Sequence, residues 1–374
     1  LFAVLRDWFT KIPQTWFSKG MMKYGSVGGF YISPMLVAIG YIVGPLFIGV
    51  WFLGAVVGDF GILIFGQKFG FFTLQQATDI KQSLGLGMMV GTGIGILIKG
   101  ILPNLKKIFG AMFSKENTGD SILPMRWAPI FLVLLVFVLT YVCNLGIIAS
   151  VITIIGVWLT TSMSSQCVGQ SGINPMEIFG IFVLLVVKTI SSIGQNEALF
   201  VAAIVAIACG LTGDVMNDFK AGHILKTNAK AQWIAEVIGG FIGAIVSVFV
   251  FYFMLKAYGG NAFNDGTFAA AQAHAVSAMI TGISNYPVFM FGLVAATILY
   301  CLKLPVMTFG LGVYLPFYLS ATAFIGGALR FIVDKFLPNF EKESKGQIIA
   351  SGVLGGEGVV GVVIAIIVAV KAIA

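Results

Sequence analysis

The chain has 374 residues, of which 58% are hydrophobic and only 10% are charged, and its mean hydropathy is +0.99. Soluble globular proteins carry about 25% charged residues, so this composition excludes a soluble protein and predicts an all-α, polytopic membrane protein. The net charge of +7 does not indicate a nucleic-acid partner, because the basic residues lie in short loops between apolar runs.

Apolar runs long enough to cross a bilayer follow one another along the whole chain. A transmembrane helix needs about 20 predominantly apolar residues. By this criterion the sequence predicts about 12 membrane segments, which are 30–48, 50–66, 84–104, 127–145, 146–163, 178–192, 196–212, 232–256, 267–282, 285–303, 306–331 and 348–371.

Three of the connections between these segments are basic, and they lie at 105–126, 213–231 and 332–347. An excess of Lys and Arg marks the cytoplasmic loops of membrane proteins, so we expect all three on the cytoplasmic side. Four predicted segments separate each basic loop from the next, and an even number agrees with this placement.

Two predicted segments that contain both Gly and Pro resemble each other. VAIGYIVGPLFIGVWFLGAVV (37–57) is similar to FGLGVYLPFYLSATAFIGGAL (309–329). The matched positions are Gly40 with Gly312, Gly54 with Gly326 and, within one position, Pro45 with Pro316. Repeated halves with interrupted apolar segments are typical of secondary transporters.

A second match follows in the same order, because GMMVGTG (87–93) and GVLGGEG (352–358) share the spacing G-x3-G-x-G. The two matches predict an internal two-fold repeat. The predicted division is the C-terminal part of a first repeat half at 1–112, a basic loop at 113–126 and a second half at 127–374. By this division, we expect the N-terminal helices of the first half to be missing from the sequence.

An interrupted helix inside a membrane exposes backbone N–H and C=O groups, which are tolerated only against protein or a water-filled cavity. The free helix ends then offer partial charges to a polar substrate. The interruptions IGYIVGP (39–45) and LGVYLP (311–316) therefore predict a substrate site to which Tyr41 and Tyr314 contribute. The alternative is that Gly and Pro only kink two packed helices.

A polar, uncharged stretch, SMSSQCVGQSGINPMEIFG (162–180), lies between apolar runs. Its hydroxyl and amide side chains both donate and accept hydrogen bonds, as the recognition of peptide-like or chelate groups requires. The residues assigned to the substrate site are Ser164, Ser165, Gln166, Gln170, Ser171 and Asn174. An exposed extracellular loop is the alternative interpretation of this stretch.

Ionisable residues within the apolar runs are Asp59, Lys99, Lys188, Glu197, Glu236, His274 and Glu357. A charge at the bilayer centre costs about 3 kcal/mol, so such residues usually face a protein interior or a cavity. Glu357 in GGEGVVG is the strongest candidate for carrying a coupling proton, and His274 and Glu197 are further candidates. The alternatives are a carboxylate satisfied by backbone groups at a helix break for Glu357, a packed core residue for His274, and snorkelling or helix capping for Glu197.

The sequence contains no G-x-S-x-G, H-E-x-x-H or P-loop motif, so no enzymatic activity is predicted. Its four cysteines lack C-x-x-C spacing and it has only two histidines, so we expect neither a metal site nor a cofactor. The proton is the expected coupling ion.

Four blocks of the chain resemble the oligopeptide transporter family, which includes the yellow stripe-like metal-chelate carriers. The polar stretch GDVMNDFKAGHILKTNAKAQWIAE (213–236) is similar to the family's D-x3-D-F-K-x-G-x2-L…Q block. ISPMLVAIGYIVGP (32–45) and GINPMEIFG (172–180) fit the same family. The segments FGLGVYLPFYLSATAFIGGALR (309–330) and IASGVLGGEGVVGV (349–362) resemble its C-terminal signature in the prokaryotic form.

The resemblance implies a secondary active transporter with about 16 membrane segments that imports peptides or metal chelates together with protons. In the polar block, Asp214 and Asp218 lie one helical turn apart with Lys220 close by, and Gly222 permits a turn. We expect Asp214, Asp218 and Lys220 to form a structural joint between groups of helices. Gly40, Pro45, Gly312 and Pro316 are the structural residues of the interruptions.

Together these features predict an integral protein of a prokaryotic plasma membrane that works as a proton-coupled transporter by alternating access. Its expected partners are a small-molecule substrate, either a short peptide or a metal chelate, and the lipid bilayer, and association into a homo-oligomer is left open. A passive channel for small polar solutes is the alternative. Channels usually carry rings of like charge or repeated filter loops, and the sequence shows neither.

Overall fold

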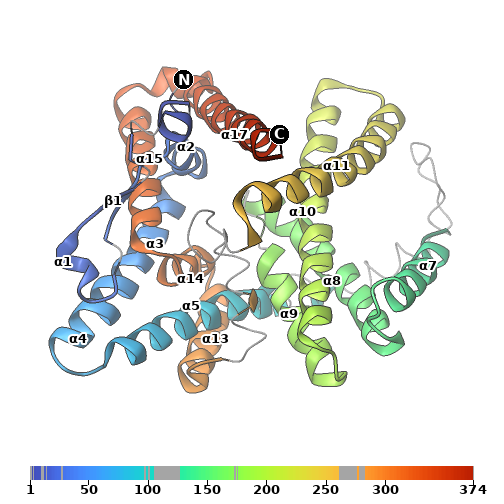
Figure 1. Ribbon diagram of the computed structural model, residues 1–374, viewed down its shortest axis with the longest axis horizontal. Helices are drawn as coiled ribbons and strands as arrows, with labels where there is room; N and C mark the ends of the chain where they lie inside the picture. Colours follow the sequence, from blue (N-terminus) through green and yellow to red (C-terminus); the bar gives the residue numbers. More distant parts are fainter. Residues whose placement is uncertain are drawn as a thin grey trace. The chain divides into compact units, whose positions relative to one another are not determined.

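The computed structural model describes the chain apart from residues 1, 3, 10–11, 14, 27, 97, 100–101, 105–126, 172–173, 175, 261–275, 278–282 and 374. Nearly all described residues are helical, which confirms the predicted all-α class (Figure 1). Six helices of the described part are long and apolar enough to cross a membrane, so the chain is a polytopic integral membrane protein.

The elements of the first half of the chain are η1 (Val4–Trp8), β1 (Thr15–Phe17), α1 (Lys19–Met22), β2 (Gly29–Tyr31), α2 (Pro34–Val43), α3 (Pro45–Ala55), η2 (Val56–Phe65), α4 (Gly66–Lys68), α5 (Leu74–Ile96), η4 (Leu102–Asn104), α7 (Ala128–Tyr141), α8 (Ile147–Ser171) and α9 (Met176–Ile190). Those of the second half are α10 (Gln195–Leu225), α11 (Ala229–Tyr258), α13 (Tyr286–Cys301), α14 (Val306–Tyr314), α15 (Phe317–Phe336), α16 (Pro338–Lys342) and α17 (Lys345–Ile373).

The helices that meet the length and composition of a membrane span lie at Pro45–Lys68, Ile147–Ser165, Gln195–Leu225, Ala229–Lys256, Phe317–Phe336 and Lys345–Ile364. Shorter apolar helices occupy Pro34–Val43, Ala128–Tyr141 and Tyr286–Cys301, where the sequence predicts further segments. The predicted segment 267–282 lies largely outside the described residues.

Two predicted loops are shorter than the sequence suggests. The predicted connection 164–177 is helical as far as Ser171, because α8 continues through its polar residues. The connection 213–231 is also mostly helical, and only a short turn separates α10 from α11. This turn follows Lys226, whose left-handed backbone (φ 57°) ends α10. The prediction of a turn at Gly222 is wrong, since Gly222 lies within α10 and is buried.

A short hairpin precedes the first membrane helix and was not predicted. Strands β1 and β2 pair antiparallel, with Trp16 opposite Phe30. The N–H of Tyr31 donates to Oγ1 of Thr322 on α15 at 2.9 Å, and this hydroxyl lies 3.0 Å from the carbonyl oxygen of Tyr31. The hairpin is therefore fixed to α15 by polar contacts at the end of β2.

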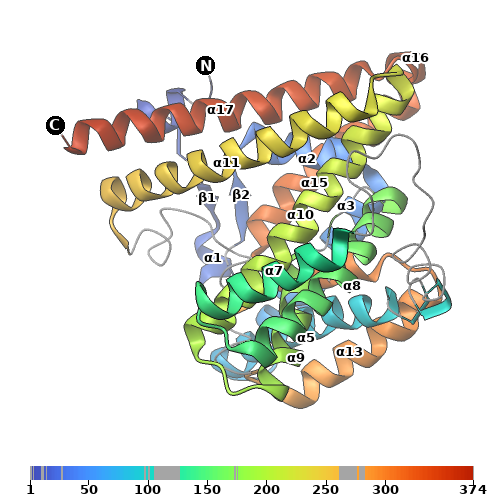
Figure 2. The same cartoon turned by 90° about the vertical axis from the view of Figure 1, so that its right-hand side faces the viewer.

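The chain divides into two compact units. The first unit contains residues 1–91, 247–270 and 283–374, and the second contains 92–246 and 271–282. In the first, α2 packs on α15 and α17, and α3 packs on α14 and α15 (Figures 1 and 2). In the second, α8, α9 and α10 pack on one another.

Both Gly/Pro segments are interrupted, 37–57 at a first break and 309–329 at a second break. At the first break, α2 ends at Val43 and α3 begins at Pro45, with Gly44 between them at φ 91°, a backbone conformation that favours glycine. At the second break, α14 ends at Tyr314 and α15 begins at Phe317, after Leu315 and Pro316. Proline supplies the stop in both cases, because it has no N–H to continue a helix.

Glycines allow the interrupted helices to approach each other to backbone contact. A Cβ atom on Gly40 of α2 would overlap the carbonyl oxygen of Ala323 on α15. A Cβ atom on Gly312 of α14 would overlap the carbonyl oxygen of Trp51 on α3. Only glycine fits at such positions, so these helices can cross at this distance only where glycine stands.

The same arrangement occurs at the other matched glycine pair. A Cβ atom on Gly54 would overlap the carbonyl oxygen of Phe309, and one on Gly326 would overlap that of Val37. Gly54 and Gly326 are 272 residues apart, and so are Val37 and Phe309, so the two contacts occupy equivalent positions of the two segments. The Gly40 and Gly312 contacts correspond in the same way. The crossing of α2 with α15 therefore has the same glycine contacts as that of α14 with α3.

Candidate functional site

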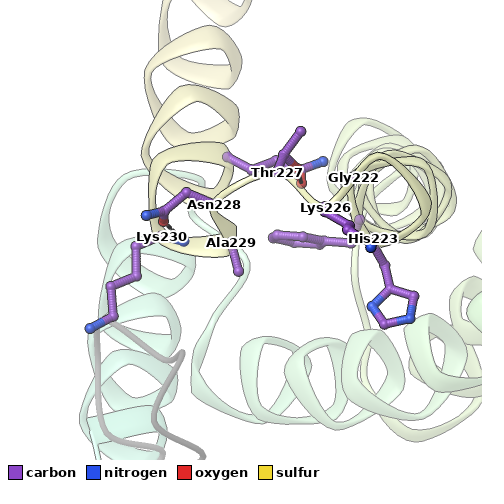
Figure 3. Close-up of a pocket in the computed structure, with 9 residues that line it drawn as sticks. Gly222, His223, Lys226, Thr227, Asn228, Ala229 and Lys230 are labelled. Atoms are coloured by element: carbon purple, nitrogen blue, oxygen red, sulfur yellow. Dashed lines mark hydrogen bonds between the residues drawn. The ribbon is translucent and has the colours of Figure 1, made fainter.

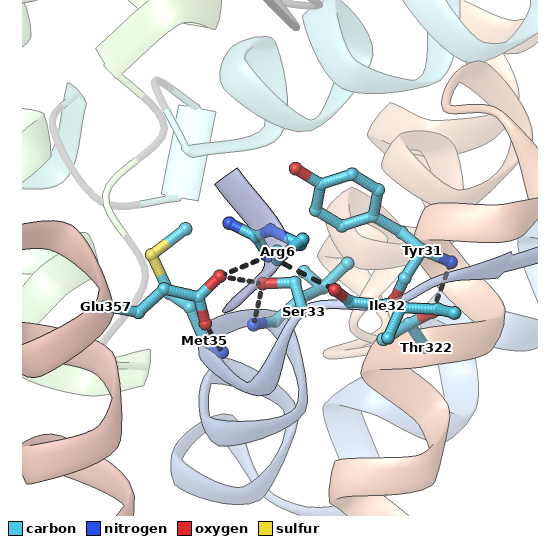
Figure 4. A network of polar contacts seen from close by, with 8 residues as sticks. Arg6, Tyr31, Ile32, Ser33, Met35, Thr322 and Glu357 are labelled. Carbon is cyan, nitrogen blue, oxygen red and sulfur yellow. Dashed lines mark hydrogen bonds and ion pairs between the residues drawn. The ribbon is translucent and has the colours of Figure 1, made fainter. Parts of the chain in front are cut away.

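The N-terminus of α2, which leads to the first break, is held by the carboxylate of Glu357 on α17 (Figure 4). Oε2 of Glu357 accepts a hydrogen bond from the backbone N–H of Met35 at 2.6 Å, and Oε1 accepts one from the hydroxyl of Ser33 at 3.0 Å. Ser33 also caps α2, because its Oγ accepts from the N–H of Leu36. A negative charge is favourable here, since the first N–H groups of a helix have no partner within it.

Arg6 completes this group, since its Nη1 lies 2.6 Å from Oε1 of Glu357. Both side chains are only 8% exposed. The same Nη1 donates to the carbonyl oxygen of Ile32 at 3.1 Å, so Arg6 binds both the carboxylate and the chain before α2. The alternative interpretation of Glu357, a carboxylate satisfied by backbone groups at a helix break, describes its contacts only in part, because α17 is unbroken at Glu357 and, in the described contacts, only the N–H of Met35 is a backbone partner. Arg6 is a partner that no sequence pattern indicated.

A second buried ion pair lies at the second break. Nζ of Lys81 on α5 is 2.6 Å from Oδ2 of Asp59 on η2, and it also lies 3.3 Å from the carbonyl oxygen of Leu315. The other carboxylate oxygen of Asp59 accepts from the hydroxyl of Ser26 at 2.8 Å. Asp59 is one of the ionisable residues in the predicted apolar runs, whereas Lys81 falls between two predicted segments, where no sequence pattern distinguishes it.

The two tyrosines predicted to bind substrate have different surroundings. The hydroxyl of Tyr41 donates to Oε2 of Glu341 at 2.8 Å, and the guanidinium of Arg330 lies 5.3 Å from the centre of its ring. Tyr41 therefore connects α2 to the α15–α16 corner. Tyr314 ends α14 immediately before the second break, and its backbone packs against Gly85 of α5. Tyr314 is thus the closer of the two to a helix interruption.

In the second unit, two predicted substrate-binding residues form a polar cluster. The hydroxyl of Ser164 on α8 lies 2.7 Å from Oδ1 of Asn174 and 2.8 Å from the carbonyl oxygen of Cys209 on α10. Nδ2 of Asn174 donates to the same carbonyl at 2.9 Å. Ser164 is fully buried. The structure therefore brings Ser164 and Asn174 together, and they satisfy each other and the α10 backbone.

The remaining predicted residues of this stretch are distributed along α8. Ser165 bonds within its own helix, with its hydroxyl 3.0 Å from the carbonyl oxygen of Ser162. Gln166, Gln170 and Ser171 belong to α8, but their side chains lie outside the described part of the structure. His274 also lies outside the described residues.

Glu197 occupies the first turn of α10, beside the N-cap residue Gly194. Its carboxylate lies next to Gly194, so a Cβ atom on that glycine would meet Oε2. A carboxylate in this position interacts favourably with the N-terminal end of the helix dipole. Glu197 thus lies at a helix end, as both alternative interpretations of this residue assume, and its role in carrying a proton stays a prediction.

The predicted joint residues Asp214, Asp218 and Lys220 are exposed on one long helix, α10. Asp214, Asp218 and Glu236 of α11 are acidic side chains close enough to interact electrostatically across the turn. No sequence pattern indicated this grouping. No group of three or more metal-binding side chains with the geometry of a metal site is found among the described residues.

A pocket of about 830 Å³ lies at the turn between α10 and α11 (Figure 3). The turn is ordered by Asn228, whose Oδ1 accepts from the N–H groups of Lys230 and Ala231 and caps α11. Gly222 leaves room for the side chain of Gln232, because a Cβ atom on Gly222 would overlap Oε1 of Gln232. The residues lining the pocket are Phe219, Gly222, His223, Lys226, Thr227, Asn228, Ala229, Lys230 and Gln232.

Curated relatives of this chain are named as transporters. A protein of Haemophilus influenzae named "Putative oligopeptide transporter" is 29% identical over 201 residues, which are 46% of this chain and 32% of that protein. A protein of Oryza sativa subsp. japonica named "Probable metal-nicotianamine transporter YSL11" is 25% identical over 169 residues, 40% of this chain and 24% of the relative. "Metal-nicotianamine transporter YSL2" of Arabidopsis thaliana is 29% identical over 113 residues, 28% of this chain and 16% of the relative.

The aligned regions thus span about a third or less of the length of these relatives. The family model covers far more of this chain. The model described as OPT oligopeptide transporter protein matches residues 2–368. The matched region includes both breaks and both ion pairs. The chain belongs to the OPT oligopeptide transporter family.

Proposed function

We propose that this protein is a proton-coupled secondary active transporter that imports oligopeptides or peptide-like metal chelates by alternating access. The observation that carries the proposal is the packing of two interrupted helices, α2–α3 and α14–α15, with one buried ion pair at the N-terminus of α2 and another at the second break. Transporters commonly bind substrate and coupling ion at such helix interruptions. The names of the relatives, which refer to oligopeptides and metal–nicotianamine, support these two substrate classes.

We further propose that the chain contains an internal two-fold repeat within about 12 membrane segments. The support is the correspondence of the glycine contacts at a separation of 272 residues, because two crossings with the same contacts are expected from a duplicated unit. Alternating access then follows from the movement of one interrupted pair relative to the helices around it.

The coupling ion in this proposal is the proton, and no resident cofactor is required. Glu357 remains the first candidate for carrying it, with His274 and Glu197 as the others. The residues proposed to contact the substrate are Tyr41, Ser164, Ser165, Gln166, Gln170, Ser171, Asn174 and Tyr314. We place the protein in a prokaryotic plasma membrane, where a proton gradient directed inwards supplies the driving force.

Transport is tested with the purified protein in lipid vesicles, using radiolabelled trialanine and iron–nicotianamine as probes. We expect at least one probe to accumulate above its external concentration when the inside is alkaline, and the accumulation to disappear when a protonophore collapses the gradient. A passive channel is the competing function. It is favoured instead if the probe only equilibrates, or if an ohmic current flows that ignores the proton gradient.

The role of Glu357 is tested in the same assay with Glu357→Gln. If Glu357 carries the proton, the variant exchanges probe across the membrane but no longer accumulates it. Glu343→Gln is the matched control, because Glu343 is also near α17 but is 61% exposed in its pair with Lys345. Accumulation by Glu357→Gln at the level of the control excludes Glu357 as the coupling site.

A further inference from the structure

Lys81 is the point at which three separate segments of the first unit meet. Its ammonium group binds Asp59 of η2 and lies within hydrogen-bonding distance of the carbonyl of Leu315, 234 positions away at the second break. The last carbonyls of a helix have no partner within it, and they form the negative end of its dipole. A cation at Leu315 therefore stabilises the open end of α14.

The position is buried and specifically shaped. Asp59 is 1% exposed and the side chain of Lys81 is 8% exposed. Gly58 leaves the space they need, since a Cβ atom there would lie 2.8 Å from the carbonyl oxygen of Val313 and 3.2 Å from Cε of Lys81. Ionisable side chains inside membrane proteins are rare, and they mark proton and ion pathways.

The net charge of the group formed by Asp59, Lys81 and Ser26 depends on whether Asp59 binds a proton. In the described contacts of Asp59, Lys81 is the charged partner, and Ser26 contributes a neutral hydroxyl. The carbonyl of Leu315 adds a dipole but no charge. When Asp59 binds a proton, its attraction for Lys81 falls from that of an ion pair to that of a neutral hydrogen bond. The net charge of the pair then changes from zero to +1.

We propose that Asp59 is a proton-binding site of the transport cycle, and that its proton controls how Lys81 holds the second break. Deprotonated Asp59 keeps Lys81 beside Leu315 and fixes the end of α14, whereas a proton on Asp59 frees the ammonium group and with it the break. The carboxylate of Glu357 differs from that of Asp59 in its partners, because it also accepts a hydrogen bond from the backbone N–H of Met35 at the start of α2. The inference rests on the proposed proton-coupled transport for its role, but the proton site itself can be tested without a substrate.

The first test is infrared difference spectroscopy of the protein as the pH is lowered stepwise. We expect a band of a buried protonated carboxyl group that is lost in Asp59→Asn, and its absence from the wild type overturns the proposal. Asp79→Asn is the control, because Asp79 lies on α5 close to Lys81 but bonds only Gln75 among its described contacts. An unchanged buried-carboxyl band in Asp59→Asn overturns the proposal.

Asp59→Asn leaves Lys81 without its carboxylate, so the double variant Asp59→Asn/Lys81→Met provides a neutral pair in case the single variant does not fold. In vesicles, we expect the double variant to exchange labelled trialanine or iron–nicotianamine but to lose accumulation driven by the proton gradient. Accumulation equal to the wild type overturns the proposal. If the wild-type protein shows the Asp59 band but accumulates neither probe, the proton site stands and the proposed transport function fails.

Discussion

The Cα atom of Gly40 lies against the carbonyl oxygen of Ala323, so closely that even a methyl group has no room between α2 and α15. Backbone carbonyls cannot move aside as the end of a flexible side chain can. Helix contacts of this kind are typical of membrane proteins, in which small residues permit close packing. The contact therefore predicts which glycines the fold cannot exchange.

Gly40→Ala is expected to lower the free energy of unfolding by about 1–3 kcal/mol, because the added methyl group must push two helices apart. Gly312→Ala is expected to have an effect of the same size, since it meets the carbonyl of Trp51 in the same way. The measurement is denaturant unfolding in detergent micelles. Gly49→Ala is the control on α3, where a Cβ atom meets nothing within 4 Å. Equal stability of Gly40→Ala and Gly49→Ala contradicts the prediction.

Glu357→Gln is expected to destabilise the protein by about 3–5 kcal/mol, because it leaves the buried guanidinium of Arg6 without its carboxylate. The exposed pair of Lys345 and Glu343 provides the comparison, and Glu343→Gln is expected to change stability by about 0–1 kcal/mol. Both values come from the same unfolding measurement. A difference of less than about 1 kcal/mol between the two variants would show that Arg6 and Glu357 are not paired in the membrane.

Ser164→Ala is expected to cost about 1–3 kcal/mol, since it removes a buried hydroxyl that lies between Asn174 and the carbonyl of Cys209. Ser162→Ala should stay within about 0.5 kcal/mol, because the hydroxyl of Ser162 bonds only the carbonyl of Trp158 in its own helix among its described contacts. Thermal unfolding with and without probe separates packing from binding. A loss of probe-induced stabilisation in Ser164→Ala, beyond its lower melting temperature, assigns Ser164 to the substrate site.

Lys226→Gly is expected to raise the free energy of unfolding by about 0.5–1 kcal/mol, because Lys226 ends α10 with φ 57° and glycine adopts this backbone without strain. Lys230→Gly is the matched variant, since it removes the same side chain from the first turn of α11. It should instead lower stability by about 0.5–1 kcal/mol. The prediction that Lys226 strains the end of α10 is contradicted if both variants shift the melting temperature in the same direction.

The sequence was sufficient where a local property decides the structure. Glycine and proline occur together at the end of a helix in both Gly/Pro segments, so both breaks could be placed within one or two residues. The polar residues of 164–177 and 213–231 predicted loops, but both ranges are largely helical. The prediction was wrong because polar side chains do not end a helix as proline does. Backbone hydrogen bonds continue through such residues when a neighbouring helix, or water, satisfies their side chains.

By itself, the sequence determined the helical membrane class and the two breaks, because composition and the glycine and proline residues of these segments act over a few residues. Only the tertiary structure decided the partners. Arg6 lies 351 positions from Glu357, and Lys81 lies 234 positions from the carbonyl that it approaches. Such pairs form where backbones cross, and the crossings depend on the packing of whole helices. No local pattern in the sequence records that packing.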